Sequence, residues 1–216
     1  MGKDKLKRFA EIETFSNVLQ LEAGIPYKGQ WATEFFKNGN PVVLELACGK
    51  GEYTVNLAQL FPDKNFIGID YKGNRIWRGA KTAIEEGINN VGFLRIQIEK
   101  LNEFFAQNEI DEIWITFPDP QPQLSREKKR LTSPRFLELY KQILRPGAFI
   151  NLKTDNDDLH AYTAEKIAER GLKLHVRTED LYHSPYADEV LNIKTYYEKK
   201  YLKDNKNINY LKFSLE

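Results

Sequence analysis

A carboxylate between two prolines, followed closely by a basic cluster, is the feature of the sequence best suited to chemistry. It lies in the stretch FPDPQPQLSREKKRL, residues 117–131, where Pro118 and Pro120 restrict the backbone on either side of Asp119. The basic cluster consists of Arg126, Lys128, Lys129 and Arg130. A rigidly held acid can orient a positively charged reactant, and clustered cations bind phosphates. The stretch therefore predicts a reaction centre beside a phosphate-binding surface, although such a run taken alone is usually a solvated face.

A short glycine loop and two strand-end acids form a second candidate site. Gly49 and Gly51 follow the apolar run of residues 42–47 and allow a ligand to approach the backbone closely. The third glycine of the dinucleotide-binding pattern is absent, which disfavours a pyrophosphate. Asp70, at the end of the next apolar run, can accept hydrogen bonds from both hydroxyls of a ribose. Glu45 interrupts a run expected to be buried, where an unpaired carboxylate is costly.

Together these residues predict a nucleoside ligand that lacks phosphates and carries a positive charge. S-adenosylmethionine fits this description better than NAD does. Each feature also has an ordinary structural explanation, because a glycine loop can be a tight strand–helix turn and Asp70 can be a helix cap.

Alternating apolar and amphipathic segments place both candidate sites on a sheet. Five successive strand–helix units predict a mostly parallel sheet covered by helices on both faces. Their strands are expected at residues 42–47, 66–70, 91–96, 112–117 and 145–154. Two later runs, 173–178 and 209–215, complete an α/β, Rossmann-like sheet of seven strands with an antiparallel C-terminal strand. Ligands of such sheets bind beyond the carboxyl ends of the strands, where both candidate sites lie.

The segment before residue 41 has a different pattern. Residues 3–20 carry apolar side chains at near-helical spacing among many charges, which predicts an amphipathic helix. We therefore expect residues 1–40 to form an N-terminal helical extension and residues 41–216 to form the main domain.

Length and composition fit a globular domain in a reducing compartment. The 216 residues are 41% hydrophobic and 29% charged, and the net charge of +1 neither supports nor excludes a nucleic-acid partner. Cys48 is the single cysteine and can form no internal disulfide. The charged N-terminus lacks an apolar signal core, and no run approaches the roughly 20 apolar residues of a membrane helix. We expect a cytoplasmic protein without a membrane partner.

The motifs resemble those of the bacterial tRNA (guanine-N7-)-methyltransferases. LELACGKGEY, FIGID, FPDPQPQLSREKKRL, KTDN and IKTYYEKKYL occur in the order seen in that family, over residues 40–213. The resemblance implies a class I methyltransferase domain in residues 41–216, with a substrate-recognition segment at about 180–200. It implies methyl transfer from S-adenosylmethionine to N7 of a guanosine in the tRNA variable loop (position 46), giving S-adenosylhomocysteine and 7-methylguanosine. No metal is implied, the partner is tRNA, and the expected assembly is a monomer or a homodimer.

The resemblance also implies roles for individual residues. The cofactor-binding positions are Glu45, Gly49, Gly51, Asp70, Gln97 and Asp119, of which Asp119 also has the active-site role. The substrate-binding positions are Gln123, Asp155, Thr195, Tyr196, Tyr197 and Glu198, with the basic cluster beside them. Two positions depart from the family: Gln97 replaces an acid expected to meet the adenine amino group, and Gln123 replaces a lysine. Both keep hydrogen-bonding capacity without the charge.

The expected chemistry needs no general base, because guanine N7 carries a lone pair and no proton. His160, His175 and His183 are therefore expected to have ordinary roles, and orientation supplies most of the rate. Glu198 could accept hydrogen bonds from the Watson–Crick edge of a guanine that has left its stack. The competing explanation of Thr195 and Glu198 is a capping box at the start of a helix.

Other functions stay open at this point. An NAD-dependent oxidoreductase uses the same first turn, but the missing third glycine and Glu45 argue against it. Methylation of an exocyclic amine favours an aromatic residue after the proline-framed acid, where Gln121 and Pro122 stand. Carbon-5 methylation of a pyrimidine needs a thiol after the fourth strand, whereas Cys48 follows the first. The remaining alternatives are another class I RNA or small-molecule methyltransferase and a non-catalytic RNA-binding module.

Overall fold

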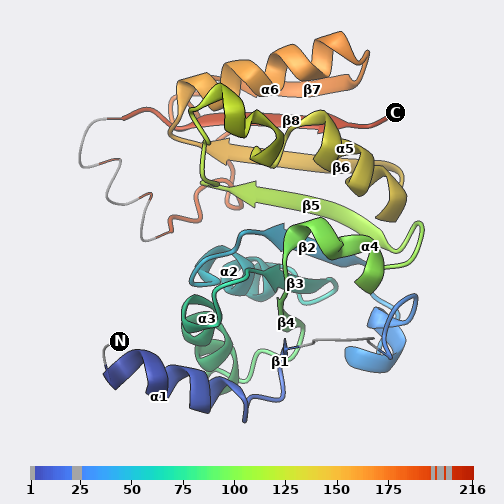
Figure 1. Cartoon of the computed structure of the whole chain (residues 1–216), viewed down its shortest axis with the longest axis vertical. Coiled ribbons are helices and arrows are strands. Elements are labelled where there is room, and N and C mark those ends of the chain that lie inside the picture. Colours follow the sequence, from blue (N-terminus) through green and yellow to red (C-terminus); the bar gives the residue numbers. More distant parts are fainter. Residues whose placement is uncertain (1–2, 21–25, 196–197, 199–201, 203–205) are drawn as a thin grey trace.

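A central sheet carries the loops that bear the predicted sites. The computed structural model describes residues 3–20, 26–195, 198, 202 and 206–216. Within these ranges, eight strands lie in the order β1-β4-β3-β2-β5-β6-β8-β7, as Figure 1 shows. The strands are β1 (Val18–Gln20), β2 (Val42–Leu46), β3 (Asn65–Ile69), β4 (Val91–Arg95), β5 (Ile110–Thr116), β6 (Leu144–Thr154), β7 (Lys173–Thr178) and β8 (Asn209–Ser214).

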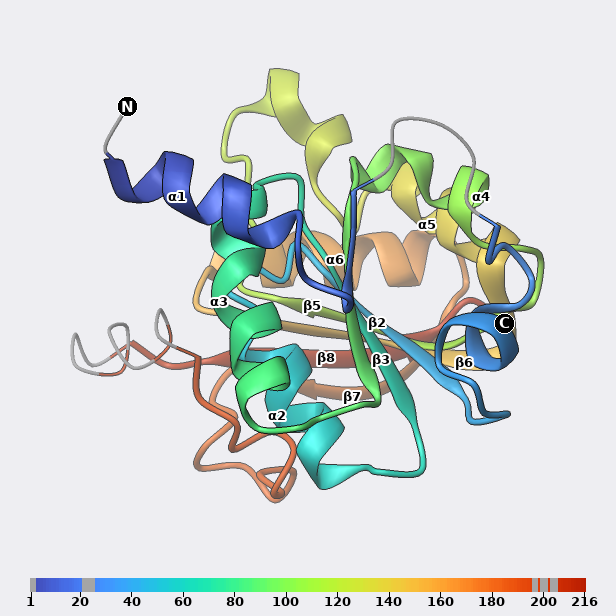
Figure 2. The same cartoon turned by 90° about the horizontal axis from the view of Figure 1, so that it is seen from below.

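Helices cover both faces of the sheet. They are α1 (Lys3–Ile12), α2 (Glu52–Leu60), α3 (Gly73–Glu85), α4 (Leu101–Phe104), α5 (Pro134–Ile143) and α6 (Asp157–Glu169), with the short turns η1 (Trp31–Phe35), η2 (Ile98–Lys100) and η3 (Leu124–Lys129). Apolar residues of α2 and α3 form one core, and α1 packs on α3. Those of α4, α5 and α6 form a second core on the other face. Figure 2 shows this layering from a second direction.

The central strands are buried on both faces, which explains their nearly continuous apolar runs. All residues of β2 and β3 are buried. β2 is parallel to both neighbours, with Leu44 opposite Ile67 of β3 and opposite Ile113 of β5. The one charged residue of β2, Glu45, must therefore find its polar partners inside the protein.

The predicted fold class is confirmed, with one correction to the sheet. The sheet is mostly parallel, and β8 is antiparallel to both β6 and β7. The predicted count of seven strands was wrong, because β1 adds an eighth at the edge of β4, with Val18 opposite Phe93.

The same strand corrects the predicted N-terminal helix, which ends at Ile12 rather than at residue 20. The hydroxyl of Thr14 donates to the carbonyl of Glu11 at 2.7 Å in the turn that follows. The side chain of Asn17 then donates to the carbonyl of Ala80 in α3 at 3.0 Å. These contacts direct the chain to the edge of β4, where pairing across the sheet outweighs the local helical spacing.

The part of the chain before residue 41 also contributes to the core. Trp31 is 1% exposed, and its indole Nε1 donates to the carbonyl of Phe104 at 2.9 Å. The division of the chain at residue 40 stays a prediction. In the part of the chain that the structure describes, no helix has the length and apolar character needed to span a lipid bilayer.

Candidate active site at the carboxyl edge of the sheet

The loops after β2, β3, β5 and β6 gather at one edge of the sheet because these strands are parallel. In Figure 1 the arrowheads of β5 and β6 end on the same side. Three non-glycine residues at this edge have left-handed backbone conformations: Ala47 (φ 58°), Phe117 (φ 49°) and Gln121 (φ 45°). Such conformations cost on the order of 1 kcal/mol or more and cluster at functional sites. The loops after β2 and β5 are therefore the first candidates for a site.

The glycine loop is packed tightly against Phe93 of β4 and against α3. Gly49 and Gly51 have positive φ angles of 58° and 70°. A Cβ on Gly51 would lie 2.4 Å from Cε1 of Phe93. On the facing helix, a Cβ on Gly79 would lie 2.7 Å from the carbonyl oxygen of Lys50. The sequence analysis missed Gly79, although a glycine inside a predicted helix is a signal for close backbone contact.

Glu45 is a buried carboxylate that accepts hydrogen bonds from uncharged groups. It is 2% exposed. Its Oε2 accepts from the backbone N–H of Thr54 at 2.8 Å and from the Thr54 hydroxyl, and its Oε1 accepts from the Thr116 hydroxyl at 2.5 Å. Thr54 lies in the first turn of α2, so Glu45 caps a helix whose N-cap residue, Gly51, has no side chain to do so. Burial raises the pKa of Glu45 to about 7 against the opposing threonine hydrogen bonds.

Asp70 connects the loop after β3 with the loop after β2. The residue is 7% exposed. Its Oδ2 accepts from the backbone N–H of Gly49 at 3.0 Å, and its Oδ1 accepts from the backbone N–H of Lys72 at 2.7 Å. Lys72 is the N-cap residue of α3. Asp70 thus fixes the glycine loop relative to the start of α3.

The loop that carries Asp119 is held at both ends while the acid itself is exposed. Oδ1 of Asp119 accepts from the backbone N–H of Gln121 at 3.0 Å, which closes a local turn. The backbone N–H of Phe117 donates to the carbonyl of Lys153 at 2.8 Å, and Nε of Arg130 donates to the carbonyl of Gln121 at 3.2 Å. The loop therefore holds a carboxylate in a fixed position at the edge.

The predicted basic cluster divides into two kinds of side chain. Arg126, Lys128 and Lys129 are exposed on η3. Arg130 is only 8% exposed, and its guanidinium lies 4.3 Å from the ring centroid of Tyr162. Arg130 thus holds the Asp119 loop through its hydrogen bond to the Gln121 carbonyl. The other three cations are exposed to solvent near the loop.

Thr195 and Glu198, which lie between β7 and β8 in the sequence, are found at the same edge. Glu198 is 0% exposed, and its Oε1 lies 2.8 Å from Nζ of Lys153. Its Oε2 accepts from the backbone N–H of Thr195 at 3.2 Å, and the Thr195 hydroxyl accepts from the backbone N–H of Glu198 at 3.2 Å. This reciprocal pair is a capping box, the competing explanation of this motif. Tyr196 and Tyr197 lie outside the described residues.

These contacts form one continuous band along the carboxyl edge. Asp70 holds the loop after β2, and Glu45 of β2 bonds Thr116 of β5. Thr116 is paired with Lys153 of β6, and the Lys153 ammonium meets Glu198. Sequence analysis missed Thr116 and Lys153, because single polar residues at the end of apolar strands give no distinctive signal.

Known proteins with similar sequences decide the family. A family model described as "Putative methyltransferase" matches residues 39–211. A tRNA (guanine-N(7)-)-methyltransferase of Christiangramia forsetii is 49% identical over 222 residues, covering 100% of this chain and 99% of the relative. Its counterpart of Clostridium acetobutylicum is 39% identical and covers 86% of each chain. The chain belongs to the tRNA (guanine-N7-)-methyltransferase family. The resemblance found in the motifs is confirmed.

Solved methyltransferase structures share the fold of this chain. The 16S rRNA methyltransferase KamB superposes with a TM-score of 0.66 at 17% identity, covering 90% of this chain and 95% of its own. A SAM-dependent methyltransferase from Aquifex aeolicus gives a TM-score of 0.56 at 14% identity, covering 96% and 98%. At such identities the likeness concerns the fold alone, and it agrees with the predicted class I architecture.

Three further positions implied by the methyltransferase family lie in loops at this edge. Gln97 follows β4 and is exposed, and Gln123 is exposed directly before η3. Asp155 follows β6, and its Oδ2 lies 3.4 Å from Nζ of Lys206. Asp155 also lines a cavity of about 770 Å³. The other charged residues that line this cavity are Asp157, Asp158, Glu179 and Lys206. The roles of all three positions stay predictions.

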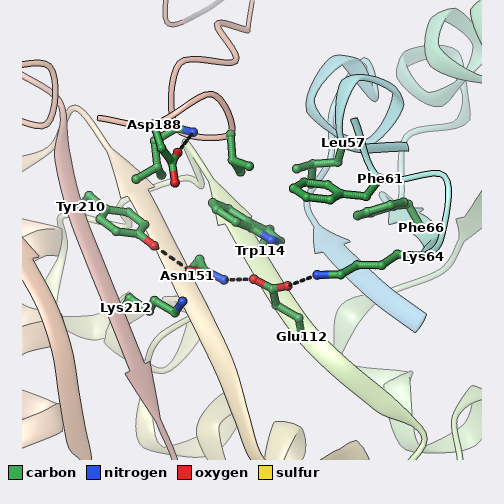
Figure 3. Close-up of a pocket in the computed structure, with 12 residues that line it drawn as sticks. Leu57, Phe61, Lys64, Phe66, Glu112, Trp114, Asn151, Asp188, Tyr210 and Lys212 are labelled. Atoms are coloured by element: carbon green, nitrogen blue, oxygen red, sulfur yellow. Dashed lines mark hydrogen bonds and ion pairs between the residues drawn. The ribbon is translucent and has the colours of Figure 1, made fainter. Parts of the chain in front are cut away.

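A second cavity lies on the face of the sheet that α2 covers. Figure 3 shows it between α2, the sheet and the turn at Asp188, with a volume of about 150 Å³. A chain of polar contacts crosses the sheet there: Nζ of Lys64 lies 3.7 Å from Glu112, Asn151 donates to Glu112 at 2.8 Å, and the Tyr210 hydroxyl donates to Asn151 at 2.7 Å. The cavity is smaller than the ~300–1,000 Å³ typical of ligand sites, so the carboxyl edge remains the candidate active site.

The three histidines lie in different elements: His160 in α6, His175 in β7 and His183 in a turn. Among the described residues, no group of three or more His, Cys, Asp or Glu side chains is arranged to hold a metal ion. The expectation of a reaction without a metal stays a prediction.

Proposed function

We propose that this protein transfers a methyl group from S-adenosylmethionine to N7 of a guanosine in the tRNA variable loop (position 46), giving 7-methylguanosine and S-adenosylhomocysteine. The observation that carries the proposal is the similarity over the whole chain, at 49% identity, to a tRNA (guanine-N(7)-)-methyltransferase. The band of acids and their partners at the carboxyl edge also supports the proposal, because ligands of open α/β sheets bind beyond the carboxyl ends of the strands.

The surroundings of Glu45 fit a cationic cofactor. Its hydrogen-bond donors, Thr54 and Thr116, are neutral, and burial raises its pKa to about 7. A positive charge nearby would therefore stabilise the ionised carboxylate. When bound, S-adenosylmethionine would supply a methyl group on a positively charged sulfur, open to in-line attack by N7. The residues that we propose hold it are Glu45, Gly49, Gly51, Asp70, Gln97 and Asp119.

The side chains of the protein then orient the reactants. N7 needs no general base, so the main contribution expected from the protein is alignment. The Asp119 loop is fixed by Gln121, Arg130 and the strand contact of Phe117. We assign Asp119 to orient the cofactor and the base and to offset the positive charge that develops on the purine.

Binding of tRNA would use the surfaces around this loop. Arg126, Lys128 and Lys129 are exposed beside Asp119 and would contact phosphates, while Arg130 would act through the loop that it supports. Asp155 lines a mostly acidic cavity, which suits the N–H donors of a base better than a phosphate. The other positions that we propose for substrate recognition, by direct contact or by positioning, are Gln123, Thr195, Tyr196, Tyr197 and Glu198.

A direct assay tests the proposal. The protein is incubated with labelled S-adenosylmethionine and unmodified tRNA, and cleavage selective for 7-methylguanine then maps the product. We expect label in tRNA and cleavage at the variable-loop guanosine, with no product from tRNA in which adenosine replaces that guanosine. Label that enters tRNA without creating such a cleavage site would overturn the assignment to N7.

We also propose that the protein acts in the cytoplasm, as a monomer or a homodimer. Light scattering after size-exclusion chromatography, with and without tRNA, distinguishes the two assemblies. A larger assembly would contradict this part of the proposal.

A further inference from the structure

Lys153 is a fully buried cation at the carboxyl end of β6, and its side chain has no part in the cofactor and substrate contacts proposed above. It is 0% exposed. Burial lowers the pKa of its ammonium, while the negative charge of Glu198 opposes that effect. The rings of Tyr53 and Tyr182 lie 5.4 Å and 5.5 Å from Nζ. A buried ammonium is costly unless its donors are all bonded, so its partners are informative.

All three N–H donors of Lys153 are used, and all three are directed to the segment that precedes and includes Glu198. Nζ donates to the carbonyl of Leu191 at 2.7 Å and to the carbonyl of Ile193 at 3.0 Å. It also meets Oε1 of Glu198 at 2.8 Å. An ammonium has three donors, so Lys153 is fully satisfied by this one segment.

The other side of Lys153 belongs to the reaction edge. Its backbone carbonyl accepts from the N–H of Phe117, which begins the Asp119 loop. Its partner across the β5–β6 ladder is Thr116, whose hydroxyl donates to Glu45. Lys153 therefore connects the strand ends that carry Glu45 and Asp119 with the predicted substrate-recognition segment.

Glu198 has little capacity left for a base. Its Oε1 already accepts from Lys153 and from the Tyr182 hydroxyl, and its Oε2 accepts from the backbone of Thr195. The residue is also 0% exposed. In this arrangement the carboxylate organises its own segment.

We propose that Lys153 is a positioning residue for methyl transfer, and that Glu198 serves tRNA recognition by anchoring its segment on Lys153 rather than by contacting the guanine. This inference rests on the proposed function and concerns how the same site recognises tRNA. The buried pair would fix the position of residues 191–195 and of Glu198 relative to the Asp119 loop.

Three variants and two substrates test the proposal. The variants are Lys153→Met, Glu198→Gln, and Lys153→Met combined with Glu198→Leu, which replaces the buried pair by apolar groups. The substrates are tRNA with guanosine or with inosine at the methylated position, because inosine keeps N7 and lacks the 2-amino donor. The readouts are kcat and KM for each tRNA, the Kd for S-adenosylmethionine by calorimetry, and the Tm.

We expect each variant to raise the KM for tRNA by about tenfold or more, with the Kd for S-adenosylmethionine within about twofold of the wild-type value. The guanosine-to-inosine ratio of kcat/KM should stay the same in every variant, because no contact to the base has been removed. Arg145→Met is the matched control. It breaks an ion pair with Asp111, 2.8 Å long, before β5 and β6 reach the reaction edge, and should change none of these values.

Two results would overturn the proposal. One is a Glu198→Gln enzyme that loses discrimination between guanosine and inosine while Lys153→Met keeps it, since Glu198 would then contact the base. The other is a wild-type KM in Lys153→Met. If that single variant does not fold, the apolar pair decides, because replacing both charges avoids leaving one unpaired. A wild-type enzyme that leaves tRNA guanosine unmethylated would instead contradict the proposed function itself.

Discussion

Glu45 shows at the scale of one residue how the fold and the predicted chemistry meet. It lies in a strand buried on both faces, yet it caps α2 through Thr54 and bonds β5 through Thr116. The same carboxylate that caps α2 is the group that a cationic cofactor would stabilise. Structural and functional explanations of this residue are therefore complementary.

The raised pKa of Glu45 predicts a specific pH dependence of stability. Between its ordinary pKa of 4.5 and its folded value of about 7, the folded state binds more protons than the unfolded state. The stabilising contribution is complete below pH 4.5 and is lost as the pH rises to about 7. Urea unfolding of wild type and Glu45→Gln at pH 5 and pH 7.5 should show the difference in free energy of unfolding moving in favour of the variant by about 2 kcal/mol. A difference that does not vary with pH would contradict the raised pKa.

Asp119 allows a cleaner test of catalysis, because asparagine keeps the oxygen that accepts from Gln121. Asp119→Asn should preserve the loop and remove only the negative charge. We expect the single-turnover rate to fall by about 100-fold, with the Tm and the affinity for tRNA close to wild type. A rate near that of wild type would show that the charge of Asp119 does not act in the transition state.

At the scale of elements, the approach of the glycine loop to Phe93 of β4 is the tightest constraint described at the candidate site. Gly51→Ala would combine a strained positive φ of 70° with a contact of 2.4 Å to Phe93. Gly87→Ala is the matched control, since Gly87 has a φ of 67° and no atom within 4 Å of the added Cβ. We expect Gly51→Ala to lose about 1–3 kcal/mol more stability than Gly87→Ala, together with binding of S-adenosylmethionine. Equal thermal unfolding of the two variants would show that the loop and Phe93 of β4 can move apart.

The elements also show which parts of the structure were predictable. β2, β3 and β5 were predicted because strands buried on both faces must be apolar, whatever their partners. β1 was missed because residues 18–20 become a strand only through the edge of β4, a partner more than 70 residues away. For the same reason the partner of Glu198 could not be predicted, since nothing in its sequence neighbourhood indicates Lys153.

At the scale of the whole molecule, the exposed cations of η3 predict a salt-dependent association with tRNA. Lys128→Glu should weaken binding and reduce the slope of log K against log salt by ~0.7–0.9 for each phosphate that the variant no longer binds. Lys141→Glu is the control, because Lys141 is also exposed but lies in the last turn of α5, which ends where β6 begins. Filter binding over a range of salt concentrations distinguishes the two. An unchanged slope in Lys128→Glu would remove η3 from the proposed tRNA surface.

Most of the candidate site was predictable because its acids and glycines follow strands directly and parallel strands bring such positions together. Arg130 shows where this reasoning stops. Sequence groups it with its basic neighbours, but its packing on Tyr162 is a matter of tertiary contact. The order of strands and loops in the sequence predicts which residues lie at the carboxyl edge of the sheet. Only the packing of the folded chain determines which of these residues are exposed to solvent.

The position of β8 between β6 and β7 has a consequence for biosynthesis. β7, Lys173–Thr178, leaves the ribosome before β8, Asn209–Ser214, yet its neighbour in the sheet is β8. Until β8 has emerged, β6 has an unpaired edge. The segment that contacts Lys153 lies between β7 and β8 in the sequence, and neither of these strands has yet joined the sheet. A nascent chain would therefore expose the loops after β2, β3 and β5 well before β8 could pair with β6, so that the carboxyl edge is completed only after β8 has been translated.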